Sequence, residues 1–115
     1  MKEFARQFTV GADHPSLAGH FPGKPIVPGV LLLDLILTEI QASVPQATRL
    51  NAIPNAKFQR PVKPNETVDV SIRIGAGEQP QMLRVRFQAS VAGRPAAEGV
   101  FLLTIDAPDC QRMLS

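Results

Sequence analysis

The feature that most constrains the fold is one segment, residues 29–44, that is apolar on every side and bounded by prolines. Pro28 and Gly29 precede the segment and Pro45 follows it, an arrangement that is typical of a helix start and a helix end. Apolar residues that point all round a helical cylinder predict a helix surrounded by protein. At 1.5 Å per residue this helix would be roughly 22–24 Å long. Its apolar residues are Val30, Leu31, Leu32, Leu33, Leu35, Ile36, Leu37 and Ile40.

Most of the remaining chain has the pattern of strands and turns. Apolar and polar residues alternate along 67–74 and 81–91, which is the period of a half-buried strand. Strands are also predicted at residues 2–10, at 50–60 with a bulge near Pro54, and at 96–105, with a tight turn at 92–94 and a loose tail at 106–115. One buried helix with four or five mostly antiparallel strands predicts an α+β domain that comprises residues 1–115.

Composition and charge exclude several classes of function. A net charge of +2, no run of five basic residues, and no Trp or Tyr argue against nucleic-acid binding. Cys110 is the single cysteine, which excludes an internal disulfide and a cysteine-based zinc site. Residues 1–10 lack the apolar stretch of a secretory signal, and the apolar run 30–37 is too short to span a bilayer. These features predict a cytoplasmic protein without membrane insertion.

Two titratable residues stand out near the helix. Asp34 lies in the middle of the apolar segment, and a buried carboxylate without a partner is costly to ionise, so Asp34 would keep its proton as a general acid does. The alternative is an aspartate that points to solvent or bonds a loop amide. His20 lies in the Pro/Gly-rich loop 11–28 and could accept a proton near pH 7. The alternative there is an ordinary loop histidine, and His14 is interpreted as part of a turn.

The third candidate element is the helix entry itself, Pro28-Gly29-Val30. The first N–H groups of a helix have no internal partner and lie at the positive end of the helix dipole. Gly29 would let a ligand approach the backbone closely. Such N–H groups could bond a thioester carbonyl and stabilise the negative charge that develops on it when the neighbouring carbon loses a proton. The alternative is a plain Pro-Gly helix entry without a ligand.

Residues 19–34 read GHFPGKPIVPGVLLLD. This segment resembles the signature of the β-hydroxyacyl-acyl-carrier-protein dehydratases, the FabA/FabZ family. That signature is a His-Phe-x-Gly-x-Pro-x-x-Pro-Gly loop that enters a helix, with an acidic residue fourteen positions after the histidine. Residues 57–64 are similar to the family's segment after the helix, and residues 97–101 are similar to the start of its last strand. The resemblance therefore extends over nearly the whole chain.

The resemblance implies the hot-dog fold, an antiparallel sheet wrapped around one long buried central helix, in a dimer whose sites combine residues of both copies. Carried over, His20 would take a proton from C2 of a 3-hydroxyacyl thioester. Asp34 of the other copy would protonate the leaving C3 hydroxyl, and the N–H of Gly29 would hold the thioester carbonyl. The product is a trans-2-enoyl thioester, and no metal or cofactor is required. The residues expected to bind substrate are Phe21, Pro28, Val30, Thr38 and Phe58.

The resemblance also predicts the partners of this chain. The substrate would be a (3R)-3-hydroxyacyl group carried as a thioester on acyl-carrier protein or coenzyme A. A homodimer is expected, with a mixed dimer as the alternative. A basic rim would suit an acidic carrier protein, and its candidate residues are Lys2, Lys24, Lys57, Arg60 and Lys63.

The chain departs from the family pattern at several positions. Asp34 is the acid of the branch that isomerises double bonds, whereas the general branch has Glu, and Thr38 stands where Gln is usual. Residues 65–66 are Asn-Glu where Gly-Asp is common. We therefore expect a divergent dehydratase of a specialised acyl pathway, such as aryl-polyene synthesis. The alternatives are a hot-dog acyl thioesterase and a non-catalytic acyl-binding or partner subunit of a dehydratase.

Overall fold

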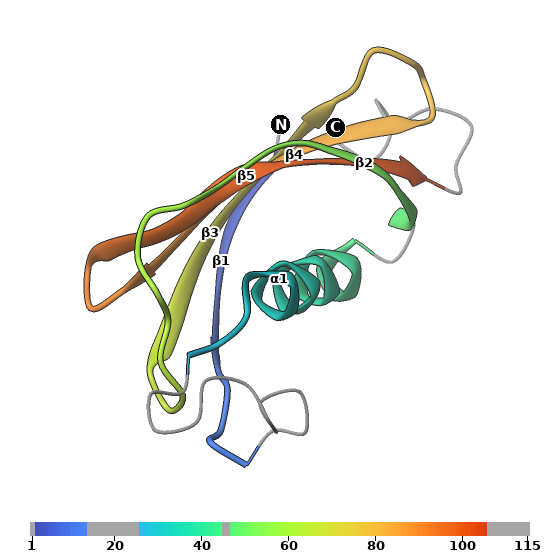
Figure 1. Cartoon of the computed structure of the whole chain (residues 1–115). Helices are drawn as coiled ribbons and strands as arrows, with labels where there is room; N and C mark the ends of the chain where they lie inside the picture. Colours follow the sequence, from blue (N-terminus) through green and yellow to red (C-terminus); the bar gives the residue numbers. More distant parts are fainter. Residues whose placement is uncertain (1, 14–25, 45–46, 106–115) are drawn as a thin grey trace.

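The computed structural model describes residues 2–13, 26–44 and 47–105. Within these ranges one helix lies against one antiparallel sheet of five strands, which confirms the predicted hot-dog architecture. Figure 1 shows the sheet curving around the helix. The elements are β1 (Lys2–Thr9), α1 (Gly29–Ser43), β2 (Ala47–Phe58), β3 (Thr67–Ala76), β4 (Met82–Val91) and β5 (Arg94–Ile105). The predicted loop residues 14–25 and the predicted tail 106–115 lie outside the described residues.

The strands follow the order β1-β3-β4-β5-β2, and each neighbouring pair is antiparallel. Strands β1 and β2 therefore form the two edges of the sheet. The predicted tight turn joins β4 to β5, where Val91 pairs with Arg94. Ala92 and Gly93 between them have φ angles of 52° and 79°. Positive φ at both central residues is the geometry of a two-residue hairpin whose twist matches the strands that it joins.

The core lies between the inner face of the sheet and one side of α1. The predicted alternation of β3 and β4 is confirmed, because every second residue is buried and the residues between them are exposed. The rings of Phe87 and Phe101 stack at the centre, with their centroids 5.1 Å apart. The buried residues of β3 and β4 are Val68, Val70, Ile72, Ile74, Leu83, Val85, Phe87 and Ala89.

The sheet covers only one side of α1 within a single chain. Leu32, Ile36 and Ile40 face the sheet and are at most 2% exposed. Val30 is 82% exposed. Asp34 follows Val30 by one turn and is also exposed. In Figure 1 no other described element lies over the side of α1 away from the sheet. The helix is thus apolar on two sides, and the chain's own sheet buries only one of them.

Strand β2 is irregular, as the proline in it predicts. Its register with β5 shifts three times, the last time between Ala52 and Asn55, on either side of Pro54. Proline has no N–H to donate, so it is tolerated on an edge strand. The bulge brings the Asn55 carbonyl oxygen so close to Gly99 that a Cβ atom on residue 99 would collide with it. In the described part of the chain, α1 is too short to cross a membrane.

Candidate functional site

The first turn of α1 presents backbone N–H groups without partners inside the helix. The N–H of Leu32 donates to the carbonyl of Pro28 at 3.0 Å, so the N–H groups of residues 29–31 precede the helical ladder. No described residue accepts a hydrogen bond from the N–H of Gly29. The entering segment is held by the Val27 N–H, which donates to the Val62 carbonyl at 2.7 Å. The predicted helix start at Gly29 is confirmed, and its role in stabilising negative charge stays a prediction.

Phe58, the last residue of β2, lies against this helix start. A Cβ atom on Gly29 would be 2.9 Å from Cζ of the Phe58 ring, which leaves room for glycine alone unless the ring moves. Phe58 is 49% exposed, so part of the residue faces solvent. Two of the predicted site residues, 29 positions apart in the sequence, are therefore brought into contact.

Gly29 and Phe58 share a groove of about 310 Å³. Apolar side chains form much of its wall, and Arg60 adds a cation at its rim. The groove thus combines a helix N-terminus with an apolar lining, as a site for an acyl thioester requires. Its other lining residues are Ile26, Val27, Leu32, Gln59, Pro61 and Val62.

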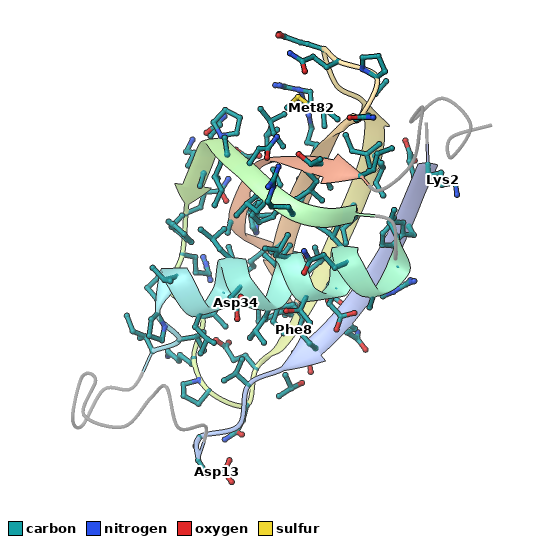
Figure 2. All side chains as sticks on the ribbon, turned by 90° about the vertical axis from the view of Figure 1, so that its right-hand side faces the viewer. Lys2, Phe8, Asp13, Asp34 and Met82 are labelled. Atoms are coloured by element: carbon teal, nitrogen blue, oxygen red, sulfur yellow. The ribbon has the colours of Figure 1, made fainter. Side chains whose placement is uncertain are left out.

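Three predicted site residues lie on the uncovered side of α1. Val30, Asp34 and Thr38 follow one another at one-turn spacing, and all three are exposed. Figure 2 looks onto this side and shows Asp34 on the helix with the sheet behind it. The expectation that Asp34 is buried is not met within one chain. The physical reason is that the sheet curves around only the opposite side of the helix.

Thr38, which stands where the family pattern has glutamine, uses its hydroxyl group within its own helix. Its hydroxyl donates to the backbone carbonyl of Asp34 at 2.9 Å. This is the bond that Thr often makes to the preceding turn of its own helix. In the described structure the Thr38 hydroxyl is thus bonded to the backbone of residue 34 and not to its carboxyl group.

Two predicted site residues, His20 and Phe21, lie outside the described residues, as does Lys24 of the predicted basic rim. The contact between His20 and Asp34 therefore stays a prediction. The described residues contain no group of three or more His, Cys, Asp or Glu side chains placed to hold a metal ion. The sequence did not predict several of the groove residues. Ile26 and Val27 come directly before the helix entry and Leu32 ends its first turn, so the position of the entry was the available signal for these three. The others not predicted are Gln59, Pro61 and Val62.

The sequence matches known dehydratases over most of its length. Residues 1–100 match the family described as ApeI-like, ApeI dehydratase. The 3-hydroxyacyl-[acyl-carrier-protein] dehydratase FabZ of Thermomicrobium roseum is 32% identical over 111 residues, which covers 90% of this chain and 73% of the relative. FabZ of an Anaeromyxobacter species is 31% identical over 105 residues, with 82% and 66% covered.

Solved structures share the fold. A chain of the dehydratase heterocomplex ApeI:P from Xenorhabdus doucetiae superimposes with a TM-score of 0.70 at 25% identity, over 89% of this chain and 87% of that one. The (R)-hydratase from A. caviae gives 0.71 at 18% identity over 90% and 94%. The fluoroacetyl-CoA thioesterase FlK gives 0.71 at 15% identity over 98% and 90%. The last two likenesses show the fold alone. The family match and the relatives at about 30% identity show that this chain belongs to the ApeI-like dehydratases, a divergent group of FabA/FabZ-type hot-dog proteins.

Proposed function

We propose that this protein is a hydro-lyase that converts a (3R)-3-hydroxyacyl thioester into a trans-2-enoyl thioester and water. The observation that carries the proposal is the N–H of Gly29, from which no described residue accepts a hydrogen bond. Gly29 lines the groove beside Phe58 and belongs to the helix that also bears Asp34. The FabZ relatives are named for this reaction on acyl-carrier-protein substrates. The thioester would lie in the groove of about 310 Å³ at the helix start.

The helix start would stabilise the charge that the reaction develops. Removal of a proton from C2 places negative charge on the thioester oxygen. A backbone N–H that points at this oxygen is already in place before the charge develops. In comparable sites such a donor lowers the activation free energy by about 3–4 kcal/mol. Pro28 has no side-chain cap bond to this turn, so no described side chain competes with the substrate for these N–H groups. The Phe58 ring shields one side of Gly29 from water.

The proton transfers are assigned to His20 and Asp34. His20 would take the C2 proton, the C3–O bond would break as the C2=C3 bond forms, and Asp34 would donate its proton so that the hydroxyl leaves as water. The protonated His20 and the ionised Asp34 then exchange protons with solvent and return to their starting states. Hydration of an enoyl thioester is the same path in reverse.

A second chain is part of the proposal. The uncovered side of α1 bears Val30, Asp34 and Thr38, and a partner seated there would exclude water from the carboxyl group. A carboxyl group in a dry site is costly to ionise, which suits a proton donor. We expect a homodimer in the cytoplasm. A mixed dimer is the alternative, since the ApeI neighbour comes from a complex described as a heterocomplex.

The proposed function is tested by incubating the protein with 3-hydroxyacyl and 2-enoyl thioesters and identifying products by mass. We expect Asp34→Asn and His20→Ala each to lower the rate by about 10²–10⁴-fold, the usual contribution of a general acid or base. Asp69→Asn is the matched control, because Asp69 is an exposed aspartate of β3 on the outer face of the sheet. Full activity of Asp34→Asn would refute the assignment.

The same reaction mixtures separate the two alternative functions. A thioesterase would release free thiol, which a thiol reagent detects, and would leave no enoyl product. A non-catalytic partner subunit would form neither product when it is incubated alone. Added to a paired dehydratase, it would raise the rate of that enzyme, and its His20→Ala variant would do the same.

A further inference from the structure

A tight turn at residues 63–66, directly before β3, is closed by two reciprocal hydrogen bonds. The N–H of Glu66 donates to the carbonyl of Lys63 at 3.2 Å. In the other direction, the N–H of Lys63 donates to Oε1 of Glu66 at 2.6 Å. Pro64 and Asn65 lie between them, and Asn65 has a φ of 69°, as the third residue of a type II turn does. The Glu66 carboxylate thus adds a second bond to a turn that the backbone closes with one.

The turn is also bonded to two segments that are distant from it in the sequence. The N–H of Asn65 donates at 2.7 Å to the carbonyl of Val10, which directly follows β1. One residue before the turn, the carbonyl of Val62 accepts the N–H of Val27 at 2.7 Å. Val10 and Val27 come directly before and directly after the stretch 11–26. The turn therefore fixes where that stretch begins and where it ends.

The position of the turn is coupled to the groove at the helix start. Val27 and Val62 both line the groove, and Val27 comes two residues before Gly29. Both valines are buried and pack into the same apolar cluster as Val10. A closely packed interior transmits small displacements. A shift of Val62 would therefore move one wall of the groove together with the segment that leads into α1.

We propose that Glu66 is a positioning residue, which closes the turn at 63–66 and thereby holds Val62, Val27 and the N–H of Gly29 in place for the thioester. This inference rests on the proposed function and adds a residue to it. Glu66 is not among the described residues that line the groove, so it would act through the backbone and not on the substrate. The stretch 11–26, which contains His20, would be held at both ends by the same turn.

The Glu66 bond is better suited to fixing the turn than to stabilising the whole fold. Lys63 is exposed and Glu66 is partly exposed, so water can reach the turn and replace a lost carboxylate bond. The backbone bond from Glu66 to Lys63 would still close the turn. Loss of the carboxylate should therefore let the turn move while the chain stays folded.

The test uses two variants of Glu66 and one matched control. E66M keeps an unbranched side chain of similar length and removes the acceptor, whereas E66Q keeps an oxygen acceptor and removes the charge. The control is Q7M, which removes the bond of the same length, 2.6 Å, that Gln7 donates to Asp69 between two exposed residues of β1 and β3. Circular dichroism and thermal melting check that all three variants fold.

The first measurement is amide hydrogen exchange, which needs no substrate. The N–H of Val27 should exchange about 10-fold faster in E66M, because its acceptor at Val62 is no longer held, while the amides of β4 keep their wild-type rates. E66Q and Q7M should exchange as the wild type does. Unchanged exchange at Val27 in E66M, or an equal acceleration in β4 or in Q7M, would overturn the inference.

The second measurement is steady-state kinetics with a 3-hydroxyacyl thioester. E66M should lower kcat about 10-fold and leave KM within about twofold, because a misplaced N–H donor is missed chiefly when charge develops in the transition state. E66Q should stay within about twofold of the wild-type kcat, because it keeps the hydrogen bond. A wild-type kcat in E66M, or an equal loss in E66Q or in Q7M, would overturn the positioning role.

Failure of the proposed function is distinguishable from failure of this inference. If the wild-type protein turns over no thioester, the dehydratase assignment fails. Hydrogen exchange at Val27 then still decides whether Glu66 holds the segment that leads into α1.

Discussion

At the scale of single residues, the contact between Gly29 and the Phe58 ring is one where a substitution should affect activity more than the stability of the fold. Alanine at position 29 would favour the helix by up to about 1 kcal/mol relative to glycine. Its Cβ would nevertheless meet Cζ of Phe58 at 2.9 Å, so the ring must turn away. Because the ring is half exposed, it can move toward solvent without disturbing the core. The contact therefore shapes the groove more than it stabilises the fold.

We predict that Gly29→Ala leaves the melting temperature unchanged or slightly raised and lowers kcat/KM about 10-fold, because the misplaced ring disturbs the thioester position. The double variant Gly29→Ala/Phe58→Ala makes room for the new methyl group and should recover part of the loss. Thermal unfolding and steady-state kinetics on the same preparations measure both effects. A single variant with wild-type kinetics would show that the position of the Phe58 ring does not affect the bound thioester.

At the scale of elements, α1 has one side that the sheet buries and one that it leaves open. Ile36 is fully buried, whereas Val30 is 82% exposed, although both belong to the same apolar run. Truncation of a buried isoleucine removes contacts and leaves a cavity, at a cost of about 2–5 kcal/mol. Truncation of an exposed side chain changes stability by about 0.5 kcal/mol or less.

We predict that Ile36→Ala lowers the free energy of unfolding by about 2–5 kcal/mol at any protein concentration. Val30→Ala should destabilise only where a partner covers the helix, so its effect should grow with protein concentration. Urea unfolding at several concentrations distinguishes the two. A concentration-independent loss of several kcal/mol in Val30→Ala would place that side chain in the core of a single chain.

At the scale of the whole molecule, the proposed site combines residues of two copies, and this leads to predictions that a site within one copy does not make. Val30→Asp should weaken the dimer, which sedimentation would measure as a shift toward monomer, while Gln88→Lys on the exposed outer face should leave the assembly unchanged.

Mixing inactive Asp34→Asn with inactive His20→Ala should restore about a quarter of the wild-type rate, because half of the random dimers regain one of two sites. No recovery after mixing would mean that both residues act within one copy.

The local features of this protein were readable from its sequence, because each depends on neighbours a few residues away. The Pro-Gly start predicted the helix to within one residue of the observed Gly29–Ser43, and strict alternation predicted β3 and β4. The turn at residues 92–94 and the irregularity near Pro54 follow from the conformational limits of glycine and proline. The candidate residues Gly29 and Asp34 were found in the same way, from their positions relative to the helix entry.

Only the tertiary structure decided which distant residues meet and which surfaces stay open. The contact of Phe58 with Gly29 and the open side of α1 both follow from the strand order and register. An apolar helix has the same pattern whether its own sheet or a second chain covers it, so the sequence could not assign Val30 and Asp34 to the open side. Register is set by packing summed over the whole sheet, which no short stretch of sequence contains.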